Sequence, residues 1–317
     1  MSFPKFPEFR KLTLEDQPEY LKYFLRLKDP YCDYSFNNLL VWLNYFDDLE
    51  ISLLNDNTII RYTNLFYGRQ VTYSLGGELR LEETLDELFK YLEKQSDNPK
   101  LYYVPKQIAD AIATLNNPRY ILEEDINNRD YVYNTDALVK MEGKTYENLR
   151  GRVNNFKKDN ENIRVGAFDL KSTAERSFIE STIQKWSRST ASLHINDPEK
   201  WERPAIKRHL DLARYLPTHA YGLYINNDTL ASIVIFHIPP HKEWIMVNHL
   251  KCDYHHREIY GYTTYRLASI AQLAGLKYMN FEQDLGIEGL QKIKTFFRPE
   301  RFLQRYTLSL TPGLKNQ

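Results

Sequence analysis

The chain has 317 residues and a mass of 37.7 kDa, and its 42 Lys and Arg residues balance its 42 Asp and Glu residues. This length favours two domains, or one large domain, with ample chain for a hydrophobic core. The neutral balance argues against a protein that coats nucleic acid or anionic membranes along its whole surface, so any anion site must be local.

The cysteines and the N-terminus indicate where the protein works. Cys32 and Cys252 are far apart and form no cluster typical of a disulfide scaffold or a zinc site. The first residues, MSFPKFPEFRKL, contain no apolar signal segment, and no later window offers about 18 uninterrupted apolar residues. We therefore expect a soluble protein of the reducing cytoplasm, without a membrane span.

Hydrophobic periodicity and turn residues predict alternating helices and strands in the first half of the chain. In chain order these are helices over 14–27 and 37–46, strands over 49–54, 58–62 and 71–75, a helix over 82–94, a strand over 101–104 and a helix over 106–115. The helix over 82–94 is amphipathic, because Leu85, Leu88 and Leu92 line one face.

The second half repeats this order. The predicted elements are helices over 173–188 and 198–215, strands over 220–225, 230–237 and 244–251, a helix over 263–273 and a strand over 277–281. Helix, three-stranded meander, helix and strand thus occur twice, without convincing residue identity between the halves. We predict two α/β domains, 1–130 and 131–317, with the second carrying the site.

The C-terminal stretch NFEQDLGIEGLQKIKTFFRPERF combines carboxylates, glycines and basic residues. Asp284 follows a predicted strand end, where α/β sheets tend to place ligands, and is a candidate base or anchor for a substrate amine, with Glu282 close by. Alternatively, Asp284 caps the turn at Gly286. Gly286 and Gly289 give backbone N–H groups room to approach an anion at a helix start.

The basic residues of this stretch come next. Lys294 follows the glycines on the predicted helix and is a candidate to neutralise a phosphate or a developing oxyanion; the alternative is a solvated surface lysine. Arg298, Arg301 and Arg305 recur at intervals of three and four, which places them near one face if the segment is helical. Pro299 interrupts such a helix.

A second basic segment lies at 144–158 and contains Lys144. A helix over 146–158 places Arg150 and Asn154 one turn apart, as a clamp for a phosphate or carboxylate. Lys157 and Lys158 are equally typical of a solvated face. If this segment and the C-terminal helix face one cleft, they form a local site for a tRNA acceptor end, a small anionic ligand or a cofactor pyrophosphate.

Lys251 and Asp253 end the strand over 244–251 and are further site candidates. Lys251 is expected to pair with a carboxylate such as Asp284, and a purely structural ion pair is the alternative. Pro239 and Pro240 prevent a helix from aligning His237 with His241, so we predict no metal site.

Three sequence motifs resemble one family. Residues 143–156, GKTYENLRGRVNNF, with Tyr146 inside them, look like the G-K-x-Y-x-x-x-R-x-x-(I/V)-N-x-F stretch of the DUF2156 family. That family contains the C-terminal domain of bacterial phosphatidylglycerol lysyltransferases. Residues 249–253, HLKCD, with Gly261 and Tyr262 after them, resemble its strand-to-helix motif, and residues 280–290 with Lys294 and Pro299 resemble its C-terminal motif.

This resemblance implies two tandem acyltransferase domains of the Gcn5-related N-acetyltransferase (GNAT) fold, each a mixed, mostly antiparallel sheet flanked by helices and splayed at its centre. It also implies a relation to Fem-type aminoacyl transferases. In the lipid-modifying members, an aminoacyl group moves from its tRNA ester to a hydroxyl. Those enzymes carry a multi-spanning membrane domain that this sequence lacks, so we expect a soluble acceptor.

The donor is the remaining question. Acetyl-CoA-dependent enzymes of this fold present a Q/R-x-x-G-x-G/A turn to the pyrophosphate, whereas this chain reads REIYGY over 257–262. A single glycine followed by Tyr does not reproduce that turn, which favours aminoacyl-tRNA as co-substrate. The alternatives are an acyl-CoA N-acetyltransferase with a degenerate turn, and a non-catalytic protein that binds a small ligand or RNA.

Overall fold

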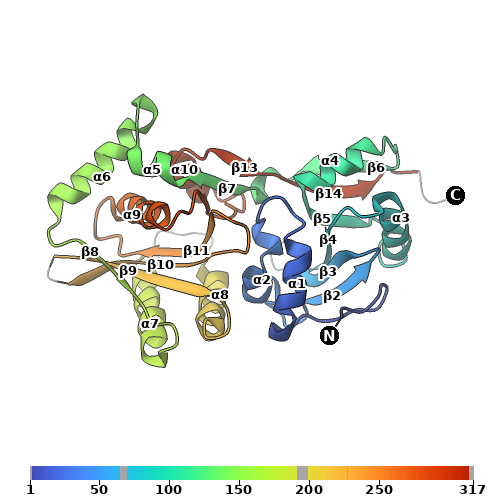
Figure 1. Ribbon diagram of the computed structural model, residues 1–317, viewed down its shortest axis with the longest axis horizontal. Helices are drawn as coiled ribbons and strands as arrows, with labels where there is room; N and C mark the ends of the chain where they lie inside the picture. Colours follow the sequence, from blue (N-terminus) through green and yellow to red (C-terminus); the bar gives the residue numbers. More distant parts are fainter. Residues whose placement is uncertain (1, 65–69, 191–198, 227, 314–317) are drawn as a thin grey trace. The chain divides into compact units, whose positions relative to one another are not determined.

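The computed structural model describes residues 2–64, 70–190, 199–226 and 228–313. The chain divides into two compact units, shown in Figure 1. Unit 1 comprises Met1–Asp130, Gln283–Gly286 and Phe302–Gln317, and unit 2 comprises Tyr131–Glu282 and Ile287–Arg301. The strand at Arg305–Leu310 groups with unit 1 because it pairs with strands there.

Unit 1 contains two sheets with helices against them. Its elements are β1 (Arg10–Lys11), α1 (Gln17–Phe24), α2 (Phe36–Asn38), β2 (Glu50–Leu54), β3 (Asn57–Asn64), β4 (Gln70–Gly76), α3 (Leu81–Leu92), β5 (Lys100–Pro105), α4 (Lys106–Thr114), β6 (Tyr120–Glu124) and β14 (Arg305–Leu310). The first sheet has the order β1-β2-β3-β4 and the second β5-β14-β6. The predicted helices and strands of this half are present within a few residues, the helix over 37–46 as α2 and a π-helical continuation at Leu39–Leu43. Strands β1, β6 and β14 are additional.

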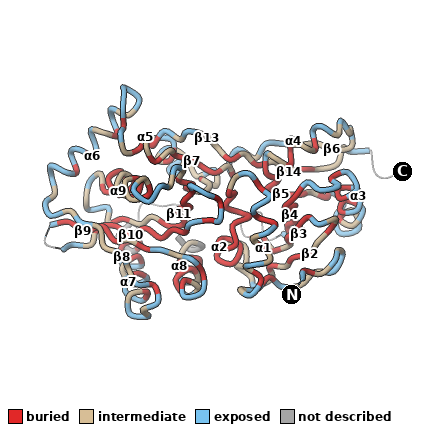
Figure 2. The backbone as a smooth tube through the Cα atoms, in the orientation of Figure 1, coloured by how far each residue is buried: buried red, intermediate tan, exposed pale blue. Residues whose placement is uncertain are grey.

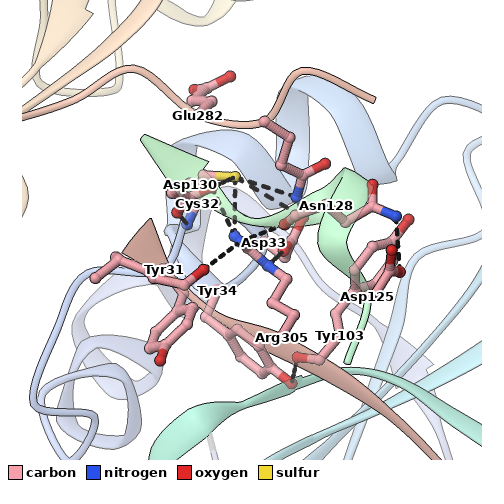
Figure 3. A network of polar contacts seen from close by, with 12 residues as sticks. Tyr31, Cys32, Asp33, Tyr34, Tyr103, Asp125, Asn128, Asp130, Glu282 and Arg305 are labelled. Atoms are coloured by element: carbon pink, nitrogen blue, oxygen red, sulfur yellow. Dashed lines mark hydrogen bonds and ion pairs between the residues drawn. The ribbon is translucent and has the colours of Figure 1, made fainter. Parts of the chain in front are cut away.

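A buried arginine ties the segments of unit 1 together (Figure 3). Arg305, with no exposed surface, donates from Nε to Asp33 and from Nη2 to Asp130 at 2.8 Å. Asp130 also accepts the backbone N–H of Cys32 at 3.0 Å. Gln283 donates to Asp33 at 2.8 Å. One guanidinium therefore links residues from the beginning, middle and end of the chain.

The structure contradicts the prediction that Arg298, Arg301 and Arg305 lie near one face of a helix. Helix α10 (Glu288–Phe296) ends before Arg298, which has a left-handed backbone with φ 59°. Arg301 begins β13 (Arg301–Leu303), and Arg305 begins β14. The three arginines therefore share no helix face. Pro299 lacks the N–H that a continued helix requires, and the extended segments beyond it find partners in sheets.

Unit 2 is built around one large sheet. Its further elements are β7 (Asp130–Asn134), α5 (Thr135–Lys140), α6 (Glu147–Asp159), β8 (Arg164–Ala167), α7 (Thr173–Thr190), α8 (Glu199–Leu212), β9 (Thr218–Ile225), β10 (Thr229–His237), β11 (Trp244–Cys252), α9 (Ile259–Leu273) and β12 (Tyr278–Asn280). The sheet order is β13-β7-β12-β11-β10-β9-β8. Pro198, where the sequence predicts the start of α8, lies outside the described residues.

Helices cover both faces of this sheet (Figure 1). Helices α7 and α8 bury Ile179, Ile183 and Leu210 against Ile233 and Ile235 of β10. Helix α9 packs on β10 and β11 from the other side, with α5 and α6 against it. The central strands are consequently buried, as Figure 2 shows. The predicted mixed, mostly antiparallel sheet flanked by helices is confirmed, with β11 and β12 forming a parallel pair.

The same order of elements occurs in both units. In unit 1 the meander β2-β3-β4 is followed by α3 and β5, and in unit 2 the meander β9-β10-β11 is followed by α9 and β12. In unit 1, β4 and β5 lie side by side yet belong to different hydrogen-bonded sheets. In unit 2, the equivalent strands pair over a short stretch and then separate.

Replacing Arg305 with Met leaves Asp33 and Asp130 buried without their shared cation. We expect Arg305→Met to lower the free energy of unfolding by about 3–5 kcal/mol, measured by urea denaturation. Lys292→Met is the control, because Lys292 pairs with Glu288 on the exposed face of α10. Equal stability of the two variants would show that the buried network contributes little.

Candidate functional site

The central feature of unit 2 is the point at which β11 and β12 separate. These strands pair in parallel at three positions, the last being Met246 with Asn280. The chain after β12 continues beside β7 instead. The backbone N–H of Phe281 donates to the carbonyl of Tyr131 at 2.9 Å, and the N–H of Tyr131 donates to the carbonyl of Glu282 at 3.1 Å. Among the described residues, no backbone pair joins the rest of β11 to this segment. The parallel pairing of β11 with β12 therefore ends at Met246.

A β-bulge lies on β11 next to this separation. In the pairing with β10, Ile235 faces His249 and Phe236 faces Val247, so that Asn248 is the extra residue. A bulge leaves one residue outside the regular ladder and re-aims the neighbouring side chains. Bulges are common beside active sites for this reason.

A chain of side-chain hydrogen bonds spans the separation. His237 Nδ1 lies 2.9 Å from Asn248 Oδ1, and Asn248 Nδ2 donates to Glu282 Oε1 at 2.8 Å. Since an amide oxygen only accepts, His237 carries its proton on Nδ1. Burial lowers the pKa of His237 to about 4, against the opposing effect of its bond with Asn248, so the ring is neutral at pH 7.

A second polar cluster lies where β11 meets α8. Lys251 forms an ion pair with Glu202, and His249 Nδ1 lies 3.6 Å from the same carboxylate. Burial opposes the ionisation of Glu202, but Lys251 and His249 outweigh it and lower its pKa to about 2. Burial lowers the pKa of His249, whose ring lies 5.4 Å from that of His209. The partner of Lys251 is thus Glu202, and not Asp284 as the sequence suggests.

A hollow of about 200 Å³ lies at the start of α9. The loop that leaves β11 leads directly into it. Its walls come from α6, this loop, the first turn of α9 and α10: Arg152, Tyr254, His256, Arg257, Glu258, Ile259, Tyr260, Gly261, Ile293, Phe296 and Phe297. The hollow therefore combines aromatic rings with cationic side chains at the positive end of a helix.

Glu258 organises the cations of this hollow. Arg152 Nη1 lies 3.3 Å and Arg257 Nε 3.5 Å from its carboxylate oxygens. The guanidinium of Arg152 also lies over the ring of Phe296, with Cζ 4.4 Å from the centroid. The side chain of Arg257 is 90% exposed, so its guanidinium faces solvent and can be reached by an incoming anion.

The structure places Lys294 inside unit 2 rather than on its surface. Its side chain is buried, and Nζ donates to the backbone carbonyl of Phe281 at 2.7 Å. Tyr133 donates to the carbonyl of Lys294 at 2.8 Å, and the ammonium lies 5.7 Å from the ring centroid of Tyr131. Lys294 thus fixes the backbone immediately before Glu282, while its predicted contact with donor phosphate stays a prediction.

Asp284 and Gly286 occupy the turn before α10, and Gly289 lies in the first turn of that helix. Asp284 has no exposed surface and accepts the N–H of Gly286 at 2.8 Å, which is the turn-capping contact that the sequence offers as the alternative to catalysis. Gly286 has φ 70°, and a Cβ there would lie 3.0 Å from Asn127. Gly289 has open space around it. The catalytic role of Asp284 stays a prediction.

Arg150 and Asn154, the predicted clamp on α6, have different surroundings from each other. Arg150 donates to the backbone carbonyls of Met141 and Gly143, and so ties down the segment after α5. Lys144 and Asn154 are exposed, and Tyr146 is half-buried.

The two basic segments nevertheless adjoin. Arg298 donates to the carbonyl of Thr145 at 3.3 Å, and Arg152 of α6 stacks on Phe296 of α10.

Asp253 begins the loop between β11 and α9. It accepts the N–H of His255 at 3.1 Å, and His255 Nδ1 lies 2.6 Å from the same oxygen. His255 lowers the pKa of Asp253 against the opposing effect of burial. Asp253 therefore shapes the loop whose later residues line the hollow.

Sequence reasoning missed Arg152, Glu202, Asn248 and His249 as members of the site. Arg152 stands beside Arg150 in the basic segment, but only the phase of α6 shows which of the two reaches the hollow. Glu202 lies about 50 residues before its partner Lys251, and no local pattern marks it. Asn248 and His249 sit in an ordinary-looking strand, since a bulge has no signal without the partner strand.

The described residues contain neither a membrane-spanning helix nor a metal-binding cluster. None of their helices is both long enough and apolar enough to span a membrane. Among the same residues, no group of three or more His, Cys, Asp or Glu side chains is arranged to hold a metal ion.

The chain belongs to the family described as phosphatidylglycerol lysyltransferase, C-terminal, which matches residues 27–309. A search of curated proteins finds no match. The family predicted from the sequence motifs is therefore confirmed. Membership supports an acyltransferase and leaves its donor and acceptor unassigned.

Similar solved structures share the fold. A conserved protein of unknown function from Bacteroides thetaiotaomicron is 22% identical over 98% of this chain and 100% of that chain, with a TM-score of 0.83. The C-terminal domain (DUF2156) of a putative lysylphosphatidylglycerol synthetase from Agrobacterium fabrum is 11% identical over 95% and 93%, with a TM-score of 0.61. L-PGS from Bacillus licheniformis is 13% identical over 98% and 94%, with a TM-score of 0.59.

The neutral state of His237 predicts a pH dependence of stability. Its folded pKa of about 4 lies below the unfolded value of 6.5, so the unfolded chain binds more protons between these values. Stability is therefore lost as pH falls from 6.5 toward 4. Between pH 7 and pH 5 we expect His237 to account for a loss of about 2 kcal/mol in the free energy of unfolding, measured by urea titration.

The matched variants are His237→Gln and His255→Gln. His237→Gln is expected to lose this part of the pH dependence, whereas His255→Gln retains it because the side chain of His255 is exposed. An unchanged pH dependence in His237→Gln would contradict a neutral buried ring.

Proposed function

We propose that this protein is an acyltransferase that moves an aminoacyl group from the 3′-end ester of an aminoacyl-tRNA to an amine or hydroxyl. The observation that carries the proposal is the separation of β11 from β12 after Met246, beside a bulge at Asn248. It is supported by membership of a family whose description names a lysyltransferase. A gap between two strands offers backbone groups to a ligand that inserts as an extended chain.

The first requirement is a place for the reacting carbonyl. The pairing of β11 with β12 ends at Met246. A backbone N–H at this edge can donate to the ester carbonyl and stabilise the negative charge that develops on its oxygen. Because the strand is held by β10 and covered by helices, the donor is fixed before the reaction begins.

The second requirement is a place for the anionic part of the donor. The hollow at the start of α9 offers Arg152, His256 and Arg257, against one carboxylate from Glu258. Guanidinium groups bind phosphate oxygens in a bidentate manner, and the first turn of a helix adds N–H donors. The exposed ring of Tyr254 at this hollow suits a base of a nucleic-acid end.

The reaction itself needs no further reagent. The nitrogen or oxygen of the acceptor attacks the ester carbonyl carbon and forms a new bond to it. The bond from this carbon to the ribose oxygen then breaks, and the proton lost by the acceptor passes to that oxygen. We assign Lys251, held near the end of β11 by Glu202, to stabilising the charged intermediate. The soluble nature of the acceptor stays a prediction.

One observation favours a second candidate, an acyl-CoA donor. A basic hollow at a helix start also suits a pyrophosphate. Against it, the stretch 257–262 contains one glycine, Gly261, which lies inside α9, and Glu258 holds the left-handed position before the helix with φ 63°. The chain thus lacks the successive glycines whose amides wrap a pyrophosphate, so we favour the tRNA ester.

The test compares donors on the same protein. We expect aminoacyl-tRNA to bind more tightly than uncharged tRNA, and acetyl-CoA to show no saturable binding in isothermal titration. Arg152→Gln and Arg257→Gln are expected to weaken aminoacyl-tRNA binding about tenfold or more each, because each removes a charge-assisted contact to phosphate. Arg164→Gln is the control, since Arg164 is an exposed residue of β8 paired with Asp228.

Other outcomes decide between the alternatives. Saturable acetyl-CoA binding with release of free thiol would replace the proposal by an acyl-CoA reaction. Equal binding of charged and uncharged tRNA, with no turnover of the ester, would replace it by a non-catalytic RNA-binding function.

A further inference from the structure

The carboxylate of Glu258 lies between the two arginines of the hollow at the start of α9. Arg152 Nη1 is 3.3 Å and Arg257 Nε 3.5 Å from its oxygens. Among the described residues that line this hollow, Glu258 is the one acidic side chain. Each guanidinium group carries one positive charge and the carboxylate carries one negative charge, so these three side chains together leave a single positive charge.

The backbone of Glu258 has a conformation that glutamate rarely adopts. Its φ of 63° is left-handed, and its carbonyl accepts the N–H of Tyr262 in the first turn of α9 at 3.1 Å. Backbone of this kind is strained in residues other than glycine, and such strain collects at functional sites. An acidic residue at a position that favours glycine therefore indicates that its charge contributes to the hollow.

The three charged side chains differ in how far water reaches them. The side chain of Glu258 is 17% exposed, whereas that of Arg152 is 51% exposed and that of Arg257 is 90% exposed. Phe296 supports Arg152 from α10, with the guanidinium carbon 4.4 Å from the ring centroid. A ligand can therefore reach the arginines from solvent, but it then comes close to a carboxylate whose charge water screens less.

The charge of the ligand decides how strongly this carboxylate opposes binding, because Coulomb repulsion is proportional to that charge. An internal phosphodiester of a nucleic acid carries one negative charge, which equals the single positive charge that the three side chains leave. A pyrophosphate that joins two nucleosides carries two negative charges, and the second one meets Glu258 without a further cation to balance it. The exposed ring of Tyr254, at 57%, adds a stacking surface for a base.

We propose that Glu258 sets the charge specificity of the hollow, so that it takes a singly charged phosphodiester of a nucleic acid and rejects a pyrophosphate. This inference rests on the proposed function, because it names the group of the donor that the hollow binds. Arg152 and Arg257 supply the attraction, and Glu258 supplies the discrimination. Glu258 is thus a specificity-determining residue that takes no part in the bond exchange.

The test measures the ratio of two affinities by isothermal titration. One probe is ApA, two adenosines joined by one phosphodiester, and the other is diadenosine pyrophosphate, the same two adenosines joined by a doubly charged group. Wild type is expected to bind ApA about fivefold or more tightly than the pyrophosphate. In Glu258→Gln this preference should fall about fivefold, because removal of one negative charge favours the doubly charged probe twice as strongly. Any loss of order in the arginines affects both probes and cancels in the ratio.

The matched control is Glu243→Gln. Glu243 is another left-handed glutamate of unit 2, with φ 66°, but it is exposed on the loop before β11, whereas the hollow follows the other end of that strand. This variant removes the same charge from the protein and should keep the wild-type ratio. Glu258→Asp retains the charge and should also keep the preference for ApA. Arg152→Gln should weaken both probes about tenfold, which shows that they bind at the hollow.

A base-free phosphodiester tests the choice of a nucleic acid as the source of the group. Dimethyl phosphate carries the same charge as ApA, as does a lipid headgroup diester, but it has no base to stack on Tyr254. We expect it to bind wild type about tenfold less tightly than ApA. Equal affinities for the two probes would overturn the assignment to a nucleic acid.

The outcomes separate this inference from the proposed function. The same ratio in wild type and Glu258→Gln, tighter binding of the pyrophosphate than of ApA to wild type, or no binding of either probe overturns the role of Glu258. None of these results depends on an aminoacyl group, because neither probe carries one. Wild type that does not distinguish charged from uncharged tRNA overturns the proposed function, and a preference for ApA that Glu258→Gln loses would still support the charge specificity of the hollow.

Discussion

The functional part of this fold depends on a competition between two strands for one short segment of chain. After Asn280, the backbone of residues 281–282 bonds to Tyr131 on the β7 side, so it cannot also pair with β11. Lys294 reinforces this choice by donating to the carbonyl of Phe281 from a buried position. The parallel pairing of β11 with β12 therefore ends after three residues.

Polar groups in unit 2 are arranged around the point at which β11 and β12 separate. On one side, Asn248 links His237 to Glu282, and near the end of the strand, Lys251 and His249 share Glu202. Buried polar groups persist in proteins when hydrogen bonds compensate their desolvation, as they do for Asn248 and for Lys251. The cations at the start of α9 are more exposed, which suits a site that takes a charged ligand from water.

Unit 1 shows a different use of buried charge. Arg305 and its two carboxylates join segments that are separated by more than 170 residues along the chain. Breaking such a group is costly, because one partner is left charged in an apolar interior. The arrangement explains why the last strand of the chain belongs to unit 1, although the sequence assigns it to the second domain. Here the ion pairs stabilise the arrangement of the strands rather than a catalytic site.

The sequence by itself determined the family, the α/β class and the meanders of both halves, because periodicity and turn residues are local signals. Asn55 and Asp56 show this directly, since both adopt the left-handed turn that their residue types favour. Local signals also placed Lys294 on a helix and Asp284 in a turn.

Only the tertiary structure decided which residues meet. The bulge at Asn248 exists relative to β10, the carboxylate of Glu202 reaches Lys251 from a helix on one face of the sheet, and Arg152 rather than Arg150 lines the hollow because of the phase of α6. Register, packing and helix phase are relations between distant segments, and no spacing within one segment encodes them.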